Sequence, residues 1–361
     1  MAVPGETLEQ TGAQPRRVLI TGLATHWGGR LARALEANDG IEAIVGVDTR
    51  EPTLELERTE FVKISNEHAL IWRIIEAVGV DTVLDTRLTV DSASTDPHEA
   101  HENNVIGTLN ILAGCSGPDS PVRKLVFKSS AHYYGCGSED PAFFEEGMPR
   151  QHAPPTDLER DVVDAEAAVA DFSARSPGVE VAVLRCANVL GSGVETSHTR
   201  LLGLPVVPMM AGFDPRYQFV HEDDVVRALE HATFGALRGV YNLAADGVLG
   251  LSEVASLLGK LPAPVIPPWG GALAAAPLRA LGIRLPEELR NQLRYGRGLD
   301  NRLLKSTGFN YAYTTRETVL AFAERQRMAP LMADEQASYH YQREVEEFLR
   351  RSPLARGKRD V

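Results

Sequence analysis

Phosphate binding is the first chemistry that the residue types and their spacing offer. Gly22, Thr25 and Gly28 stand three residues apart, between an apolar run at residues 18–20 and a helical apolar pattern around Leu31. A strand, a tight turn and a helix in this order direct backbone N–H groups and the positive helix end at one point, where the pyrophosphate of a dinucleotide can sit. The Thr25 Cβ obstructs the closest backbone approach to a phosphate, but its hydroxyl can offer a hydrogen bond instead.

Asp48 supplies a matching group for the sugar of a nucleotide. It ends a predicted strand at residues 44–48, at the distance where dinucleotide-binding folds place an acid on the adenosine ribose hydroxyls. A carboxylate there repels a 2′-phosphate, so the predicted cofactor is NAD rather than NADP. A glycine-bearing turn that binds nothing is the alternative, and an acid in register with the turn favours the nucleotide.

A second group of reactive side chains follows a predicted strand at residues 122–130. Oxidation of an alcohol needs a group that holds the substrate oxygen and a group that takes its proton as hydride leaves the carbon. His132 or Tyr133 could take the proton, and the hydroxyl of Ser130 stands beside them in the sequence. A simply solvated histidine is the alternative for His132. Lys128 is a weaker candidate for the same role.

The elements that must position these residues alternate between short apolar strands and amphipathic helices. This alternation predicts an α/β fold with a Rossmann doubly wound parallel sheet. A smaller C-terminal substrate-binding lobe is what the resemblance to a known family implies. The expected segments are a flexible N-terminal tail (1–15), an NAD(P)-binding domain (16–190, completed by about 217–245), a substrate-binding lobe (191–216 and 246–330) and a charged C-terminal tail (331–361).

Composition argues against several other classes of protein. The formal net charge of −12 would repel a nucleic acid. No uninterrupted apolar run reaches the roughly 18 residues of a membrane-spanning helix, and the first 16 residues lack the apolar core of a signal peptide. The three cysteines have no zinc-ligand or disulfide-framework spacing. We therefore expect a cytoplasmic protein with a small-molecule substrate or ligand, no metal and no nucleic-acid partner.

Five ordered segments carry family-like motifs: the glycine turn (TGxxGxxG), His101–Leu112 (NVxGTxNLL), Ser129–Gly135 (SSxxVYG), Arg185–Gly191 (LRxxNVYGPG) and Gln218–Leu229 (FVHVDDVVxAL). They resemble those of the extended short-chain dehydrogenases/reductases of the NAD-dependent epimerase/dehydratase family, and the chain is similar to nucleotide-sugar 4-epimerases. The resemblance implies a substrate contact for Ser130, a cofactor-site position for Asn104, where it braces the active-site strand, and substrate orientation by Asn188.

Two positions depart from the family pattern near the expected cofactor and substrate. Asp85, Thr86 and Arg87 end a predicted strand where the family commonly has small apolar residues. These groups could hold an unusual ligand, with Thr86 beside the cofactor, or Asp85 and Arg87 could pair internally. Nucleotide-sugar members also carry a diphosphate-binding arginine four residues before the FVH histidine. Tyr217 stands there, and Arg216 is displaced by one position.

The largest departure concerns the family's YxxxK pair, in which a tyrosine acidified by a lysine transfers the proton. Leu158 and Val162 occupy those positions in the predicted helix at residues 156–169, so the pair is absent. Two functions follow. One is an NAD-dependent oxidoreductase or isomerase with an atypical active site, which acts on a nucleotide sugar or, given the aliphatic stretch Leu201–Met210, a hydrophobic alcohol. The other is a non-catalytic NAD(H)-binding sensor or scaffold.

The resemblance also implies a homodimer. Family members often pair two helices from each subunit in a four-helix bundle. The matching segments in this chain are Pro97–Cys115 and Thr156–Phe172, the second with spaced apolar side chains.

Overall fold

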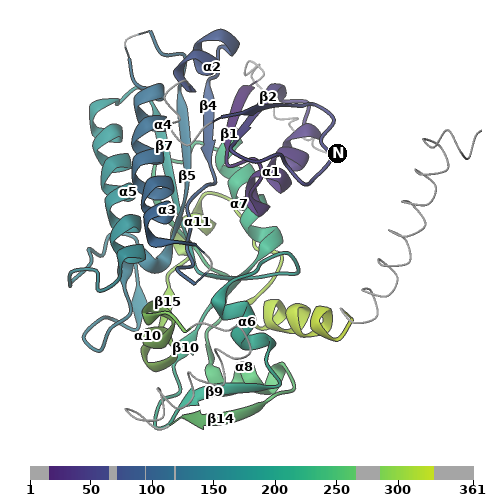
Figure 1. The fold of residues 1–361 in the computed structure, drawn as a ribbon, viewed down its shortest axis with the longest axis vertical. Helices are drawn as coiled ribbons and strands as arrows, with labels where there is room; N and C mark the ends of the chain where they lie inside the picture. Colours follow the sequence, from purple (N-terminus) through teal and green to yellow (C-terminus); the bar gives the residue numbers. More distant parts are fainter. Residues whose placement is uncertain (1–15, 65–70, 94, 118, 266–284, 329–361) are drawn as a thin grey trace, which may run out of the picture.

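The computed structural model describes residues 16–64, 71–93, 95–117, 119–265 and 285–328, and Figure 1 shows its ribbon. The two tails predicted at residues 1–15 and 331–361 lie outside the described residues. Two lobes share the chain: a larger one built around a central sheet, and a smaller one made of short strands and helices.

Seven parallel strands form the central sheet, in the order β12-β7-β5-β4-β1-β2-β3. The side chains of Val18, Leu19 and Ile20 in β1 are completely buried, because helices cover both faces of the sheet. The order changes direction between β1 and β4, and doubly wound sheets bind ligands at the carboxyl ends of the strands at such a point. The strands are β1 (Arg16–Thr21), β2 (Ile41–Asp48), β3 (Thr59–Lys63), β4 (Thr82–Asp85), β5 (Lys124–Ser130), β7 (Glu180–Cys186) and β12 (Gly239–Leu243).

Helices cover the two faces of this sheet and give the larger lobe three layers, which confirms the predicted fold class (Figure 1). Leu31 and Leu35 of α1 pack with Val225 and Leu229 of α7 in a core on one face. Ile75, Ile111 and Val169 belong to a second core on the other face. The first face carries α1 (His26–Glu36), α7 (Glu222–Phe234) and α11 (Arg302–Ser306), and the second carries α2 (Ile71–Val78), α4 (Gly107–Cys115) and α5 (Asp157–Arg175).

The helix predicted at residues 97–115 contains an irregular turn. A short α-helix, α3 (Pro97–His101), continues into a π-helical turn, η1 (Glu102–Ile106), and then into α4. A Cβ at Gly107 would lie 2.3 Å from Nη1 of Arg87, so the side chain of Arg87 occupies the space beside this turn. The π-turn thus lies where the helix meets the end of β4.

The smaller lobe is built from short segments gathered below the carboxyl ends of the central strands (Figure 1). It contains a four-stranded sheet in the order β13-β10-β15-β6 and a separate pair, β9 and β14. Its elements are β6 (Phe143–Phe144), β9 (Val206–Met210), β10 (Arg216–Tyr217), β13 (Leu249–Gly250), β14 (Leu261–Val265), β15 (Gly296–Leu299), α6 (Ser197–Gly203), α8 (Leu251–Leu257) and α10 (Glu287–Tyr295).

Two features of the smaller lobe differ from the expectation. Leu201, Val207 and Met210 pack in the core of this lobe and do not line its cleft, because β9 and α6 turn them toward α8 and α10. Leu304 and Phe309, which the sequence assigned to this lobe, belong to the core of the larger one, where α11 packs on β12.

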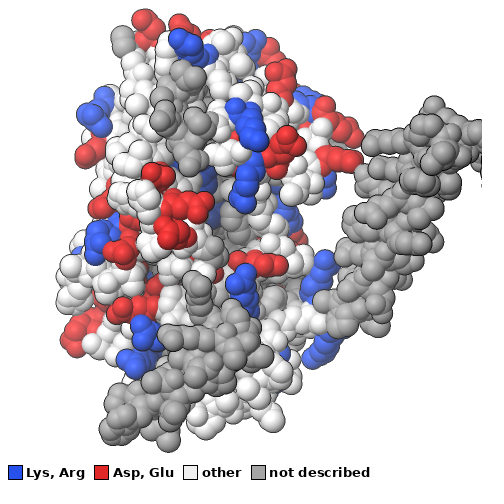
Figure 2. Space-filling model, viewed as in Figure 1, with Lys and Arg blue, Asp and Glu red and all other residues white. Residues whose placement is uncertain are grey.

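The surface of the described residues carries charges of both signs. Figure 2 shows acidic and basic side chains interspersed over the visible face rather than separated into regions of one sign. No helix among the described residues has the length and apolar character needed to cross a membrane.

Candidate functional site

The glycine turn joins β1 to α1, and the side chain of Thr25 makes hydrogen bonds across it. Thr25 is the N-cap of α1, and its Oγ1 accepts a hydrogen bond from the Gly28 N–H at 3.0 Å and donates one to the Gly22 carbonyl at 2.7 Å. A Cβ at Gly28 would lie 2.1 Å from the Gly22 carbonyl oxygen, so this position requires glycine. The Thr25 hydroxyl is therefore used within the turn, and the hydrogen bond to a ligand that the sequence suggested is not available.

Asp48 lies at the carboxyl end of β2, facing the same turn. Its Oδ2 accepts a hydrogen bond from the Ala24 N–H at 2.9 Å, and its Oδ1 accepts one from the Thr49 N–H at 2.7 Å. The carboxylate is half-buried and lines a cavity of about 330 Å³, which we call the Asp48 cavity. The other residues that line it are Thr25, Thr49, Arg50, Arg87, Thr89, Thr95, Glu99, Glu102 and Asn103.

At the end of β4, Asp85 and Arg87 form an internal ion pair. Of the two interpretations of the sequence, ligand binding by these groups or internal pairing, the structure has the pairing. Nη2 of Arg87 lies 2.9 Å from Oδ2 of Asp85, and both side chains are buried. Thr21 also donates a hydrogen bond to Asp85, at 2.9 Å. Thr86 donates to the Thr21 carbonyl at 2.9 Å and lines the large cavity described next. Asp85 is thus held inside the fold.

A cavity of about 810 Å³ lies between the two lobes, and we call it the interlobe cavity. The start of α1 and the ends of β5 and β7 line one side, and α6, α10 and β15 line the other. Its polar lining includes Thr25, His26, Thr86, Arg87, Lys128, Ser130, His132, Asn188, Ser197, His198, Glu288 and Arg297. The residues predicted for catalysis and substrate binding, Ser130, His132 and Asn188, therefore meet in one cavity, together with Thr25 and Thr86, which the sequence assigned to the cofactor.

Ser130 and His132 form a hydrogen-bonded pair in this cavity. Oγ of Ser130 lies 2.8 Å from Nδ1 of His132 and caps the short 3₁₀ helix η2 (Ala131–Tyr134). Burial lowers the pKa of His132 well below 6.5, and the nearby cations Arg297 and Arg150 act in the same direction, together with His198. His132 is therefore a neutral imidazole at neutral pH, with a nitrogen that can share or take a proton.

Other sequence candidates lie elsewhere. The Tyr133 ring packs on the Arg185 guanidinium, 3.5 Å from its central carbon, and does not line the cavity. Arg216 is exposed in β10, also away from the cavity. Asn104, expected at the cofactor, is completely buried and lines neither cavity, because its side chain holds the backbone of Thr89 through hydrogen bonds of 2.8 and 2.9 Å.

The residues at the family's tyrosine and lysine positions are part of the core. Leu158 is 3% exposed and Val162 is completely buried, and neither lines the interlobe cavity. The opening turns of α5 thus present apolar side chains to the core, and the chemistry of this cavity depends on β5 and η2.

Sequence reasoning did not assign Arg297 or His198 a role, although both line the interlobe cavity. Arg297 is 6% exposed and donates a hydrogen bond to the Gly135 carbonyl at 2.9 Å. It has no carboxylate partner in the described ranges. Burial lowers the pKa of His198 to about 4. Arg290, Arg294 and Arg297 follow one another closely in the sequence, but only the structure shows that Arg297, in β15, lines the cavity.

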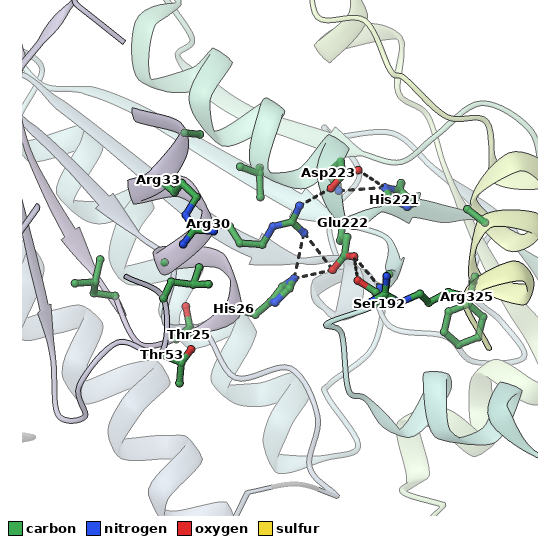
Figure 3. A pocket seen from close by; sticks show the side chains of 18 residues that line it. Thr25, His26, Arg30, Arg33, Thr53, Ser192, His221, Glu222, Asp223 and Arg325 are labelled. Carbon is green, nitrogen blue, oxygen red and sulfur yellow. Dashed lines mark hydrogen bonds and ion pairs between the residues drawn. The ribbon is translucent and has the colours of Figure 1, made fainter. Parts of the chain in front are cut away.

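A further cavity, of about 750 Å³, lies on the outer side of α1 against α7 (Figure 3). Glu222 is its central group: Oε2 lies 2.8 Å from Nε2 of His26 and 3.1 Å from Nη1 of Arg30. Burial would raise the pKa of Glu222, but hydrogen bonds from His26 and Ser192 outweigh it and hold the pKa at about 2. These contacts fix the first turns of α1, which also border the interlobe cavity.

This combination of a doubly wound sheet, a glycine turn and an acid at the end of β2 defines a Rossmann-type dinucleotide-binding fold. The model of the NAD dependent epimerase/dehydratase family matches residues 18–244, so the chain belongs to this family. An uncharacterised protein of Mycobacterium tuberculosis is 31% identical over 326 residues, which span 88% of this chain and 86% of that protein. A protein of the same description from Mycobacterium bovis is equally similar.

Solved structures resemble the fold over most of its length. MoeE5 in complex with UDP-glucuronic acid and NAD gives a TM-score of 0.66 at 23% identity, covering 87% of this chain and 99% of that chain. UDP-glucuronic acid 4-epimerase from Bacillus cereus in complex with NAD gives 0.66 at 15% identity, covering 86% and 96%. At these identities the likeness concerns the fold.

Proposed function

We propose that this protein binds NAD and acts on a nucleotide sugar in the interlobe cavity, as an NAD-dependent oxidoreductase or isomerase with an atypical active site. The observation that carries the proposal is the position of Asp48 beside the glycine turn, in a cavity that adjoins the Ser130–His132 pair through Thr25, Arg87 and Thr89. Complexes of the structural neighbours MoeE5 and the Bacillus cereus epimerase with NAD support it.

The residues present fit the dinucleotide. Gly22 has a φ of +82° and a Cβ there would lie 2.6 Å from the Arg87 side chain, so only glycine keeps the turn open. Asp48 would hold the adenosine ribose, and the first N–H groups of α1 would hold the pyrophosphate. When bound, NAD supplies a nicotinamide ring that accepts and returns hydride.

Ser130 and His132 would then act on the substrate. The Ser130 hydroxyl can bind the substrate oxygen while His132, neutral at physiological pH, takes the proton through the 2.8 Å contact. Asn188 and His198 line the same cavity and can orient polar substituents. Because these residues are polar and Leu201, Val207 and Met210 pack in the core, the cavity favours the nucleotide sugar over the hydrophobic alcohol that the sequence left open.

The alternative, a non-catalytic NAD(H)-binding sensor or scaffold, is supported by α5. Leu158 and Val162 are buried in the core, so this helix offers the cavity neither a phenol nor an ammonium. A pure protein that binds NAD but neither forms NADH nor converts any of a panel of nucleotide sugars to another sugar, as followed by chromatography, would favour this alternative. Substrate-dependent NADH formation would exclude it.

Substitution of Asp48 tests the cofactor site. We expect Asp48→Asn to weaken NAD binding about tenfold and to narrow the preference for NAD over NADP, because the carboxylate both accepts from the ribose and repels a 2′-phosphate. Calorimetric titration with NAD, NADH, NADP and NADPH measures both effects. Asp39→Asn, an exposed acid in the turn before β2, is the control. An unchanged preference in Asp48→Asn would place the nucleotide elsewhere.

We also propose a homodimer formed through α3, η1, α4 and α5. Ile106 and Leu109 lie on these packed helices with 44% and 47% of their side chains exposed, which a second copy could cover. Leu109→Glu should therefore shift the protein to monomer, as measured by analytical sedimentation at micromolar concentration. Wild-type protein that sediments only as a monomer would contradict this proposal. A cytoplasmic location stays a prediction from the sequence.

A further inference from the structure

Lys128 is a buried cation that forms no ion pair with any described residue. It lies near the end of β5, and its side chain is only 2% exposed. Among the described residues it has no hydrogen bond and no ion pair, and its Nζ lies 5.0 Å from the centre of the Trp27 ring. It lines the interlobe cavity together with Thr25 and His26. An ammonium held this way is costly unless a ligand supplies the opposite charge.

The neighbours of Lys128 do not supply that charge. Asp85 is near enough to favour the charged form of Lys128, but its carboxylate is bound by Arg87 and Thr21. The buried Cys186 thiol is the other neighbour, and burial raises its pKa, so it stays neutral. Burial lowers the pKa of Lys128 itself, as expected where no anion compensates it.

A second positive feature lies at the same place. Trp27 belongs to the first turn of α1, whose N-terminal end carries the positive pole of the helix dipole and N–H groups that have no acceptor within the helix backbone. One of these groups, the Gly28 N–H, donates to Thr25 Oγ1 and is not available to a phosphate. The turn thus offers a phosphate fewer donors than an all-glycine turn would, and Lys128 lies on the sheet side of the same space.

We propose that Lys128 binds the pyrophosphate of the dinucleotide from the sheet side of the interlobe cavity, and compensates for the phosphate contact that the turn loses at Thr25. This inference rests on the proposed NAD site. It gives Lys128 a role in cofactor binding, whereas the sequence offered it only as a weaker candidate for the proton acceptor. The same ammonium would bind the diphosphate of ADP-ribose, which lacks the nicotinamide. Adenosine, which has no phosphate, would gain nothing from it.

Calorimetric titration of Lys128→Met with NAD, ADP-ribose and adenosine tests the proposal. We expect the affinity for NAD and for ADP-ribose to fall about tenfold to a hundredfold, and the affinity for adenosine to stay unchanged. Lys128→Arg should keep most of the affinity, and raising the salt concentration should weaken wild-type binding more than binding by Lys128→Met. Lys305→Met, which removes a surface charge outside the cavity, is the matched control.

A second variant connects Lys128 to the turn. Thr25→Gly should restore part of the ADP-ribose affinity in the Lys128→Met background, because the backbone can then approach the phosphate. Thermal unfolding without ligand should show Lys128→Met to be at least as stable as wild type, since methionine fills the space of the lysine stem without a buried charge.

The outcomes separate this inference from the proposed function. Equal binding of ADP-ribose by wild type and Lys128→Met would overturn the role of Lys128 and leave the NAD site standing. Wild-type binding of ADP-ribose that Lys128→Met loses, without any binding of NAD, would overturn the redox function and support Lys128. A loss of adenosine binding equal to the loss for ADP-ribose would indicate a general disruption and overturn the specific contact.

Discussion

Replacing Glu166 by alanine is expected to lower the free energy of unfolding by about 3–5 kcal/mol, since it leaves a buried charge without its partner. Glu166 Oε2 accepts hydrogen bonds from Nη2 and Nε of Arg185 at 2.6 and 3.0 Å, and both side chains are about 5% exposed. Ser129 also donates to Glu166. Burial alone would lower the pKa of Arg185, but the contact with Glu166 outweighs it and raises the pKa. The guanidinium keeps its charge near neutral pH even without Glu166, because the ordinary pKa of arginine is above about 12.

Removal of Glu166 should also disturb the Ser130–His132 pair, because Glu166, Arg185 and Ser129 connect three elements of the fold. Arg185 extends from β7, Glu166 from α5 and Ser129 from β5, one residue before Ser130. The Tyr133 ring of η2 packs on the Arg185 guanidinium. Without Glu166, the end of β5 and η2 lose a fixed neighbour, so the Ser130–His132 geometry should loosen together with the fold.

Urea unfolding of three variants measures the contribution of the pair. Glu166→Gln keeps the shape but loses the charge and should lie between wild type and Glu166→Ala. The double variant Glu166→Met/Arg185→Met replaces both charges by apolar groups and should recover much of the stability, because no charge is left unpaired. A loss below about 1 kcal/mol in Glu166→Ala would mean that solvent reaches Arg185 and that the pair is not structural.

The elements whose sequence period matches their burial were predictable. The continuous apolar run in β1 indicates a strand covered on both faces, and Asp48 falls at the end of the next strand because βαβ units have a regular length. For these residues local pattern and tertiary environment agree. The resemblance placed Asn104 at the cofactor, whereas its side chain is buried and bonds to the backbone of Thr89.

Tertiary contacts decided the rest. Asp85 and Arg87 could face a ligand or each other, and only the positions of Thr21 and Gly107 favour the pair. Lys128 shares one face of β5 with Ser130, but the sequence does not tell whether a carboxylate lies close enough to form an ion pair with it. Leu201 and the residues after it have the same apolar pattern whether they line a cleft or fill a core, since periodicity does not distinguish the two environments.

Replacing Ser130 by alanine should reduce turnover of a nucleotide sugar with NAD by about a hundredfold or more, while NAD binding stays within about twofold of wild type. The Ser130 hydroxyl is the group in the interlobe cavity that contacts Nδ1 of His132, and alanine removes both the substrate contact and the path of the proton. Chromatography of the nucleotide sugars follows turnover whether or not hydride returns to the product, absorbance at the NADH band follows any net oxidation, and calorimetry follows binding. Undiminished turnover would exclude Ser130 from the reaction.

Ser129→Ala is the matched control, because its hydroxyl faces Glu166 on the other side of the strand. It should keep turnover within about tenfold of wild type, whereas His132→Gln should lose as much as Ser130→Ala. The pH profile gives an independent readout of His132. Since burial holds the pKa of His132 well below 6.5, the imidazole stays neutral as pH falls through 6.5, and turnover should persist there. A loss with its midpoint near 6.5 would instead indicate a solvent-exposed histidine as the base.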